Sequence, residues 1–307
     1  MGSQDTGEHD YRGVRGTRRL ATSDNIWGGD EEVDPRLVVL TGSRMGEPFL
    51  IVDGAELVIG RDIQTDLVLE SRSVSRRHAR ISRLADQVYI EDLGSANGSD
   101  VAGERIKGRV ALRNGDLLRL GTATLKYFAS ASLESEYHRK IFDMATRDGL
   151  TGLRNRSYFM DALKRMLPQH TQREVPLSLA IVDLDYFKVI NDEYGHDVGD
   201  QALRDTARTL ERGIGELDIV ARIGGEEFAL ILDAADAEQA VKTLVQLQVD
   251  LADVTRSPDR PMLSFSAGVV TVPADVEEDD VSKLLKSADL ALYKAKQNGR
   301  DRVEVAD

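Results

Sequence analysis

The sequence predicts two folded domains of different class, an all-β sandwich followed by an α/β (α+β) domain, joined by a helix. From residue 36 to residue 128, short apolar runs alternate with polar residues and turns and show no helical period. From about residue 148 onward, apolar positions at helical spacing alternate with buried-type strands. A chain of 307 residues, 41% hydrophobic, is long enough to form two cores of this size.

The composition excludes several classes of protein. A net charge of −13 argues against a nucleic-acid partner or an anionic membrane surface, so phosphate ligands would need metal ions or a few well-placed cations. The absence of cysteine excludes disulfides and thiolate zinc sites and is compatible with a reducing compartment. No apolar run approaches the roughly 20 residues of a membrane helix, and no secretory signal is recognisable. We therefore expect a cytoplasmic protein with no membrane span.

Residues 1–35 are predicted to form a disordered arm, because they contain few large apolar residues, several glycines and mixed charge. Thr17 and Thr22 lie among arginines in this arm. The stretch Arg18–Thr22 is similar to a basic-directed kinase site, which is a pattern of low specificity. The arm is therefore a candidate for phosphorylation.

Residues 36–128 are predicted to form a β-sandwich, because many short strands follow one another at close spacing. The expected strands are Leu37–Leu40, Phe49–Val52, Leu57–Ile59, Leu67–Leu69, Ala79–Ser82, Val88–Glu91, Leu117–Leu120 and Thr124–Phe128. Several of them alternate apolar and polar residues, as expected for strands with one buried face.

Three predicted loops of this sandwich share one chemistry. They are Gly60-Arg61, Ser73–His78 and Ser95–Gly98. Arginine guanidinium, serine hydroxyl and asparagine amide groups suit a phosphate and a peptide backbone. With these spaced Gly-Arg, Ser-x-x-His and Asn-Gly signatures, the segment resembles the forkhead-associated (FHA) family of phosphothreonine-binding modules. We interpret Gly60 and His78 as residues that shape the loops.

The FHA resemblance implies a phosphopeptide site. Arg61 and Ser75 would hold the phosphate, Arg76 would assist, and Asn97 would grip the peptide backbone beside the phosphothreonine. Ser99 departs from the threonine that often follows Asn-Gly in the family, without affecting these four positions.

Residues 129–146 are predicted to form a connecting helix, because they lack glycine and proline and carry an apolar stripe at helical spacing. The stripe consists of Leu133, Tyr137, Ile141 and Met144. It could pair with a second copy as a short coiled coil or pack on its own domain, and the sequence leaves both open.

Residues 147–307 are predicted to form a mixed sheet covered by helices. The strands include Leu177–Leu184 and Leu263–Val270, and the helices include Gln201–Gly213 and one at about 280–297. Between them, two glycines in Arg222–Phe228 place a tight reversal, which predicts a β-hairpin.

The hairpin and the strand before it carry the chemistry. Glu226 and Glu227 would repel each other at the hairpin tip and suit a hard cation, and the two glycines let a ligand approach the backbone. Asp183 and Asp185 end a buried strand, which delivers carboxylates to a sheet edge. On physics alone, Asp183 and Glu226 indicate a metal-dependent site with room for a nucleotide.

Two further residue pairs fit a guanine nucleotide. The amide of Asn191 and the carboxylate of Asp200 match the hydrogen-bonding edge of guanine. Lys296 and Arg300, near the end of the last helix, are placed for phosphate oxygens.

Taken together, these segments resemble the GGDEF family of diguanylate cyclases, in its GGEEF variant. The ordered motifs that carry the resemblance are Asp148–Arg156, Asp183–Asp200, Gly224–Phe228, Ser264–Val269 and Tyr293–Arg300. The resemblance implies a palm-like domain that condenses two GTP molecules into cyclic di-GMP across a homodimer, a nucleotidyltransferase reaction.

The resemblance also implies the roles of individual residues. Asp183, the Leu184 carbonyl and Glu226 would hold two Mg²⁺ or Mn²⁺ ions. Glu226 is the favoured base, and Glu227 a second metal ligand or orienting group. The implied substrate-binding residues are Phe187 and Lys188 (through their backbone amides), Lys296 and Arg300 (for phosphates), Asn191 and Asp200 (for guanine), and Gly224 and Gly225 (at the turn).

One position departs from the family pattern. Many members carry Arg-x-x-Asp before the hairpin, where the product binds and inhibits, but here Gly215 replaces the arginine while Asp218 remains. Arg212 would have to reach further. We therefore expect weak or absent product inhibition through this site.

Other functional interpretations stay open at this point. The chain could be a phosphothreonine-reading scaffold whose GGDEF domain senses a nucleotide without catalysis, or a cyclase that makes a mixed dinucleotide. The phosphothreonine could belong to a partner protein or to the chain's own arm at Thr17 or Thr22, whose tethering gives a high effective concentration.

Overall fold

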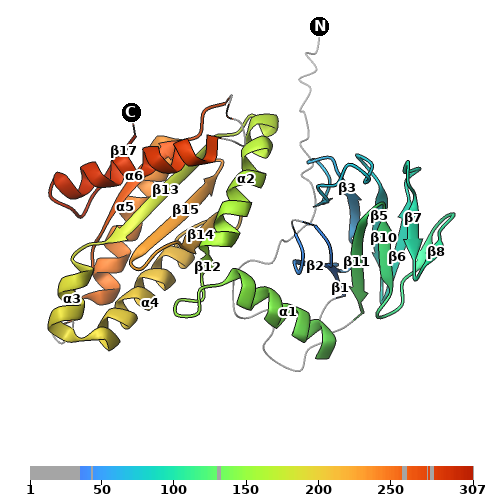
Figure 1. Cartoon of the computed structure of the whole chain (residues 1–307), viewed down its shortest axis with the longest axis horizontal. Helices are drawn as coiled ribbons and strands as arrows, with labels where there is room; N and C mark the ends of the chain where they lie inside the picture. Colours follow the sequence, from blue (N-terminus) through green and yellow to red (C-terminus); the bar gives the residue numbers. More distant parts are fainter. Residues whose placement is uncertain are drawn as a thin grey trace, which may run out of the picture. The chain divides into compact units, whose positions relative to one another are not determined.

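The computed structural model describes residues 35–42, 44–129, 133–257, 261–274, 276 and 280–306. Residues 1–34 of the predicted arm, with Thr17 and Thr22, lie outside these residues. The chain forms two compact units, Met1–Arg139 and Lys140–Asp307, each of which is described by itself (Figure 1). The domain bounds predicted at residues 35, 128 and 146 remain predictions, because the division between the units falls within a helix.

The first unit contains two β-sheets. The six-stranded sheet has the order β2-β1-β11-β10-β7-β8 and the five-stranded sheet has the order β4-β3-β5-β6-β9. The strands are β1 (Arg36–Val39), β2 (Pro48–Leu50), β3 (Glu56–Gly60), β4 (Leu67–Val68), β5 (Ala79–Leu84), β6 (Gln87–Asp92), β7 (Ser99–Val101), β8 (Glu104–Arg105), β9 (Val110–Ala111), β10 (Leu117–Leu120) and β11 (Ala123–Phe128). Neighbours are antiparallel except β3 and β4.

The apolar faces of both sheets form one core, which includes Leu37 of β1, Ile59 of β3, Ile81 of β5 and Leu118 of β10. This arrangement confirms the predicted sandwich. The strands β7, β8 and β9 were not predicted. Neither β7 nor β8 has an apolar run like those that indicated the equally short β2 and β4, whereas Val110–Ala111 of β9 was a usable signal.

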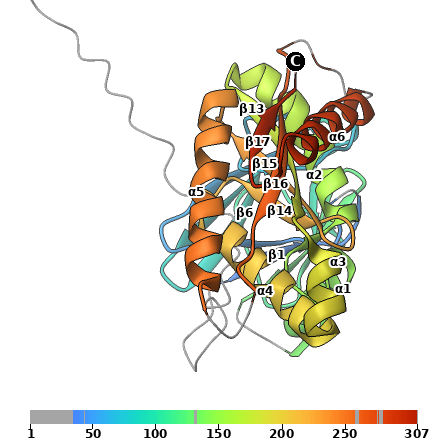
Figure 2. The same cartoon turned by 90° about the vertical axis from the view of Figure 1, so that its left-hand side faces the viewer.

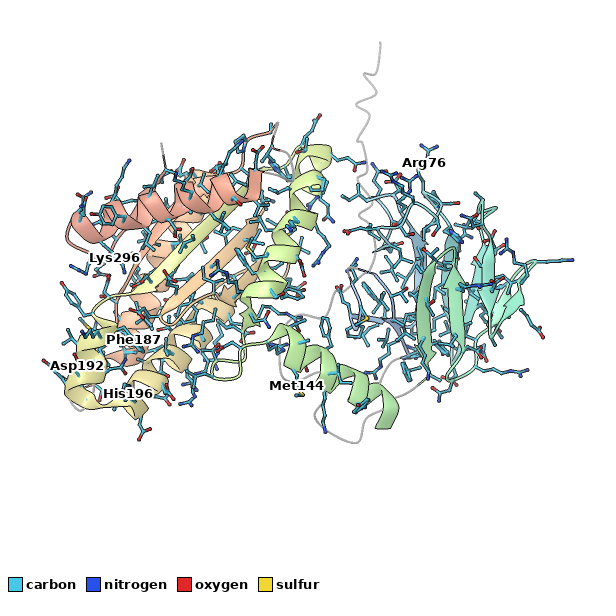
Figure 3. All side chains as sticks on the ribbon, viewed as in Figure 1. Arg76, Met144, Phe187, Asp192, His196 and Lys296 are labelled. Carbon is cyan, nitrogen blue, oxygen red and sulfur yellow. The ribbon has the colours of Figure 1, made fainter. Side chains whose placement is uncertain are left out.

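The helix α1 (Leu133–Thr146) links the two units. Phe142 is buried and makes an edge-to-face contact with Tyr158, with the ring centroids 6.5 Å apart. Tyr137 and Met144 are 63% and 83% exposed, and Ile141 is also exposed. Met144 projects away from the helix in Figure 3. Three residues of the predicted stripe therefore face away from the core of this single copy.

The second unit is built on one mixed sheet with the order β12-β14-β15-β13-β16-β17. Its strands are β12 (Arg154–Asn155), β13 (Leu177–Leu184), β14 (Ile219–Arg222), β15 (Glu227–Asp233), β16 (Phe265–Thr271) and β17 (Val303–Val305). The central pairs are antiparallel, while β12–β14 and β16–β17 are parallel. All eight residues of β13 are buried, as expected for a central strand.

Helices cover both faces of this sheet (Figure 2). One core contains residues of α2 (Arg156–Arg173) and α6 (Val281–Gln297). The other contains residues of α4 (His196–Arg212) and α5 (Ala237–Thr255). The β13 residues alternate between these cores: Leu179 and Ile181 belong to the first and Ala180 and Val182 to the second.

Two local features matter for the candidate site. The short helix α3 (Phe187–Tyr194) follows β13 directly, so that the end of the central strand leads into a helix N-terminus. Gly268 lets α6 approach β16, since a Cβ at this position would lie 2.1 Å from the Ala288 carbonyl oxygen. In the described parts of the chain, no helix combines the length and apolar character required to cross a bilayer.

Candidate functional site

The end of β13 brings carboxylates from two strands together. Asp183 is the register partner of Glu227 on β15, and Leu184 N–H donates to the Glu226 carbonyl oxygen at 3.2 Å. We call Asp183, Glu226 and Glu227 the acidic edge. Asp183 is only 6% exposed, whereas both glutamates are partly exposed. The sheet pairing therefore delivers one buried and two accessible carboxylates to the same place.

The Asp183 carboxylate has an unusual electrostatic environment. Burial raises its pKa, the neighbouring Lys296 ammonium acts in the opposite direction, and the charges of Glu226 and Glu227 raise it further. Lys296 Nζ lies 2.6 Å from Asp183 Oδ1, but this buried oxygen accepts no hydrogen bond of good geometry among the described residues. The acidic edge therefore has more negative charge than Lys296 alone can compensate.

The hairpin tip is fixed by its own backbone and by Arg222. Ile223 N–H donates to the Glu227 carbonyl oxygen at 2.9 Å. The Arg222 guanidinium donates to the Gly225 carbonyl oxygen at 2.6 Å and to Asp148 Oδ1 at 3.0 Å. A Cβ at Gly224 would lie 2.4 Å from Glu227 Oε2, so a side chain there would displace this glutamate.

Asp148 ties the hairpin to the turn that follows α1. Its carboxylate accepts hydrogen bonds from the Thr151 hydroxyl and the Thr151 N–H, in addition to Arg222. Burial acts to raise the pKa of Asp148, but these hydrogen bonds and the Arg222 charge outweigh it, so the pKa is lowered. No role was predicted for Asp148 or Arg222, although an arginine two residues before a Gly-Gly turn was a usable signal.

The acidic edge fits a hard divalent cation by its chemistry. The available donors are carboxylate oxygens, which Mg²⁺ and Mn²⁺ prefer, and the buried Asp183 Oδ1 has unused hydrogen-bonding capacity. Within the described residues, no three His, Cys, Asp or Glu side chains already stand in a metal-binding arrangement. The side chains of the acidic edge would therefore have to move to coordinate a cation.

Donors for phosphate lie at the same end of the sheet. Tyr186 precedes α3 with φ 56° and provides no side-chain cap, so the first N–H groups of this helix, at Phe187 and Lys188, have no partner within the helix. The Arg300 guanidinium lies 4.8 Å from the centroid of the Tyr186 ring. Figure 3 shows Phe187 and Lys296 at this end of the second unit.

The two residues predicted to read guanine also come together. Asn191 on α3 reaches the start of α4, because a Cβ on Gly199 would lie 1.9 Å from Asn191 Oδ1. Asp200, the next residue after Gly199, is partly exposed, and Arg204 Nη2 is 3.9 Å from its Oδ2. The amide and the carboxylate therefore lie on adjoining positions of two helices.

The Gly215–Asp218 loop has a different arrangement. Asp218 Oδ2 accepts from Gly215 N–H at 2.7 Å and its Oδ1 accepts from Asp233 N–H at 2.8 Å. Burial nevertheless raises the pKa of Asp218. Arg212 lines a cavity of about 480 Å³, whose other lining residues are Gln201, Asp205, Arg208, Thr209, Gly213, Asp250 and Val254. The retained aspartate is thus used by its own loop.

In the first unit, the three predicted loops converge. Arg61 N–H donates to the Ser75 carbonyl oxygen at 2.9 Å, and Arg61 Nε donates to the Val74 carbonyl oxygen at 3.3 Å. Ser75 Oγ accepts from Ala96 N–H at 2.9 Å, which leaves its own hydroxyl proton available. Asn97 Nδ2 donates to the backbone of the second loop, at Ser73 O, 2.7 Å away.

His78 holds two of these loops, as predicted. It is fully buried, its Nδ1 accepts from Ser75 N–H at 3.0 Å, and its Nε2 lies 3.1 Å from the Gly98 carbonyl oxygen. These partners require the neutral tautomer with the proton on Nε2. Gly60 permits close approach of the loops, since a Cβ there would be 2.0 Å from the Arg76 carbonyl oxygen. The Arg76 side chain is exposed (Figure 3).

Sequence reasoning missed a ring of hydroxyl groups beside this site. Ser71 Oγ lies 2.8 Å from Ser73 Oγ and 3.0 Å from Thr122 Oγ1, and Ser73 Oγ lies 2.8 Å from Thr122 Oγ1. Ser73 and Thr122 are far apart in the sequence, so only the fold reveals the contact. The ring joins the loop that carries Ser75 to the turn between β10 and β11.

Fold and site define the class of the protein: an all-β FHA-type sandwich followed by a palm-like α+β domain with an acidic sheet edge. The family model "Diguanylate cyclase, GGDEF domain" matches residues 145–302, and the FHA domain model matches residues 57–121. The first match spans more than half of the chain, which therefore belongs to the GGDEF family.

Curated relatives match between half and three fifths of the chain. The chain is 37% identical over 179 residues to the probable diguanylate cyclase DgcC of Escherichia coli K12, covering 58% of this chain and 48% of the relative. It is 34% identical over 163 residues to the response regulator PleD of Caulobacter vibrioides, covering 52% of this chain and 36% of the relative. The chain thus spans less than half the length of these two proteins.

Solved structures agree with this assignment. The coiled coil and GGDEF domain of DgcB from Caulobacter crescentus in complex with c-di-GMP is similar with a TM-score of 0.51 and 31% identity, over 56% of this chain and 91% of that one. Diguanylate cyclase SiaD in complex with its activator SiaC from Pseudomonas aeruginosa has a TM-score of 0.51 and 30% identity, over 57% of this chain and 66% of that one.

Proposed function

We propose that the chain is a diguanylate cyclase. Two GTP molecules, one on each GGDEF domain of a homodimer, would react so that each 3′-hydroxyl attacks the α-phosphate of the other, giving cyclic di-GMP and two pyrophosphates. The observation that carries the proposal is the buried Asp183 carboxylate beside the Glu226–Glu227 hairpin, in a chain whose relatives include named diguanylate cyclases.

The acidic edge would hold the metal ions. Asp183, the Leu184 carbonyl oxygen and Glu226 would bind two Mg²⁺ or Mn²⁺, with Glu227 as a second metal ligand or orienting group. When bound, these cations lower the pKa of the attacking hydroxyl and neutralise charge on the pyrophosphate. Glu226 would accept the hydroxyl proton. Lys296 contacts Asp183 in this structure and would contact phosphate oxygens instead when a cation is bound.

The remaining residues would bind and orient GTP. The backbone N–H groups of Phe187 and Lys188 and the side chains of Lys296 and Arg300 would contact the β- and γ-phosphates. At the other end of the substrate, Asn191 and Asp200 would read guanine. An ionised Asp200 accepts from guanine N1–H and its exocyclic amine but would face a lone pair on adenine N1, which favours GTP over ATP.

Product analysis tests the enzyme. Purified protein with GTP and Mg²⁺ is expected to form cyclic di-GMP, identified by mass, and Glu226→Ala is expected to form none. Glu238→Ala, an exposed glutamate on α5, is the matched control and should retain activity. A mixed dinucleotide in the mass spectrum would correct the substrate assignment.

Two copies must meet for this reaction, and α1 offers one route. Tyr137, Ile141 and Met144 are exposed at positions i, i+4 and i+7 of the helix, which suits a short parallel pairing with a second copy. Met144→Glu should then weaken dimerisation, measured by analytical ultracentrifugation, and lower activity at a given protein concentration.

We further propose that phosphothreonine binding to the FHA domain regulates or localises the cyclase. Arg61 and Ser75 would hold the phosphate with help from Arg76, and Asn97 would hold the peptide backbone. The ligand would be a partner protein or the chain's own arm at Thr17 or Thr22. Fluorescence anisotropy with arm peptides phosphorylated at either threonine tests the second source, and equal binding of the unphosphorylated peptides would rule it out.

A second candidate is a phosphothreonine-reading scaffold whose GGDEF domain senses a nucleotide without catalysis. The contact between Lys296 and Asp183 favours it, because an ammonium group at the metal position could stabilise a metal-free receptor. Tight GTP binding with no product at any protein concentration would support this function over the cyclase.

A further inference from the structure

Asp185 is a buried carboxylate that the proposed mechanism does not use. It is 3% exposed and lies two residues after Asp183. Its Oδ1 accepts from the Ser266 hydroxyl at 2.8 Å, and its Oδ2 accepts from the Ser264 hydroxyl at 3.1 Å and from Asp301 N–H at 3.0 Å. Both oxygens thus have partners within the protein, so Asp185 is not available as a direct ligand of metal or substrate.

The Asp301 N–H belongs to a strained turn. After α6, Gly299, Arg300 and Asp301 have φ values of 113°, 62° and 47°. Two consecutive residues with side chains in the left-handed region are unfavourable and persist only where their surroundings hold them. Here Arg300 N–H donates to the Ala295 carbonyl oxygen at 3.1 Å, and Asp301 N–H donates to Asp185.

Asp185 also lies two residues before the start of α3. Tyr186, the next residue along the chain, has φ 56°, and its ring carries the Arg300 guanidinium at 4.8 Å. The main chain of Asp185 is fixed as well, because its N–H donates to the Ser264 carbonyl oxygen at 2.9 Å. Asp185 therefore joins the end of α6 to the N-terminus of α3.

We propose that Asp185 is a positioning residue for the triphosphate. It holds the turn that carries Arg300 against the N-terminus of α3, so that the guanidinium and the backbone N–H groups face the same phosphates. The inference rests on the proposed GTP-binding function. Because Asn191 and Asp200 lie further along α3 and α4, loss of Asp185 should affect the phosphates selectively and leave guanine recognition intact.

Nucleotide binding to the full chain tests this role. Calorimetry measures the binding of two ligands, GMP and a GTP analogue whose α- and β-phosphates are joined by a methylene group. The titration with the triphosphate analogue is repeated at increasing Mg²⁺ concentrations. Asp185→Ala should bind the triphosphate analogue about tenfold more weakly, since a charge-assisted hydrogen bond at the turn is lost. The affinity for GMP and the Mg²⁺ concentration at half-saturation should not change. Asp185→Asn, which retains one acceptor oxygen, should fall in between.

Asp218→Ala is the matched control, because Asp218 is a partly buried carboxylate that also accepts main-chain N–H groups, in the Gly215–Asp218 loop. It should lose stability but bind both nucleotides as the wild type does. If Asp185→Ala is insoluble, Ser264→Ala removes a single donor and should show a smaller loss with the same selectivity for the triphosphate.

Three results would overturn the positioning role of Asp185. The first is an equal loss of affinity for GMP and for the triphosphate analogue. The second is a shift in the Mg²⁺ concentration at half-saturation, which would make Asp185 part of the metal site. The third is wild-type affinity in both Asp185 variants. If the wild type bound no triphosphate analogue, the proposed function itself would fail, and the role of Asp185 with it.

Discussion

Asp183 and Asp218 are aspartates of the same domain, the first buried and the second partly buried, and desolvation raises the pKa of both. They differ in how their oxygens are used. Asp218 accepts a main-chain N–H on each oxygen, whereas in the described part of the chain Asp183 Oδ1 is paired with a side chain alone, the Lys296 ammonium 2.6 Å away, and keeps capacity for a further ligand. The comparison teaches that a raised pKa does not identify a site. The unused hydrogen-bonding capacity of a buried oxygen is the better indicator.

The largest expected effect separates these two residues. Asp183→Asn should lower the rate of cyclic di-GMP formation on the order of a thousandfold, because it removes charge that compensates the catalytic cations. Asp218→Asn should retain most of the activity. Steady-state rates of pyrophosphate release at saturating Mg²⁺ measure both. Equal losses in the two variants would mean that free coordination capacity does not distinguish the acidic edge from the Gly215–Asp218 loop.

The same criterion applies to the first unit. Among the described residues, Arg61 uses only its Nε in a side-chain hydrogen bond, so its terminal nitrogens can engage a phosphate. Arg61→Ala should weaken binding of a phosphothreonine peptide roughly a hundredfold, as expected for loss of a charge-assisted, bidentate contact. Arg113→Ala, an exposed arginine, should bind normally. Fluorescence anisotropy measures the affinity of both variants for the peptide. Similar losses of affinity would indicate non-specific attraction between the peptide and the positive charges of the domain.

A third comparison sets Asp218 against Asp148, because their pKa values move in opposite directions. Because the pKa of Asp148 is lowered in the folded protein, this carboxylate stabilises the fold at pH values above its unfolded pKa of about 3.8. That stabilisation is lost as the pH falls from about 3.8 through the folded pKa. The raised pKa of Asp218 makes folding less favourable as the pH rises from about 3.8 through the folded value.

Urea unfolding from about pH 2.5 to pH 7 should therefore give opposite trends for two variants, with the change for Asp148→Asn falling below about pH 3.8 and that for Asp218→Asn above it. The free-energy deficit of Asp148→Asn should grow with pH, and that of Asp218→Asn should shrink, each by about 1.4 kcal/mol per pKa unit of the shift at most. Parallel trends would show that one of the two carboxylates has been assigned the wrong environment.

How far the sequence predicts the fold depends on the length of its patterns. The strand Leu177–Leu184 was predicted with its observed bounds, because six consecutive apolar or small residues lead to the carboxylate of Asp183. The hairpin around Gly224 and Gly225 was predicted from its turn chemistry. The strand Glu104–Arg105 could not be predicted, since two exposed residues show no alternation.

The candidate site was predictable where residues close in the sequence carry it. Asp183 and the Glu226–Glu227 hairpin are each recognisable from a short stretch of sequence, and the sheet register then places them side by side. Asp185 is not, because its partners Ser264 and Asp301 come from distant segments, and its importance depends on a backbone strain that no motif encodes.

Product inhibition should change least, and it tests most directly whether unused oxygens separate Asp183 from Asp218. Gly215→Arg restores the arginine of the family's inhibitory motif, yet both oxygens of Asp218 accept N–H groups of its own loop and of β15. A product ligand would have to displace those bonds, and each displaced N–H would be left without its partner. We therefore expect cyclic di-GMP titrations to show little inhibition in the wild type and no more in Gly215→Arg. Strong inhibition in the variant alone would show that the arginine is the single missing element. The hydrogen bonds that Asp218 already accepts would then be no obstacle to binding of cyclic di-GMP. Unused coordination capacity would therefore not be the property that separates Asp183 from Asp218.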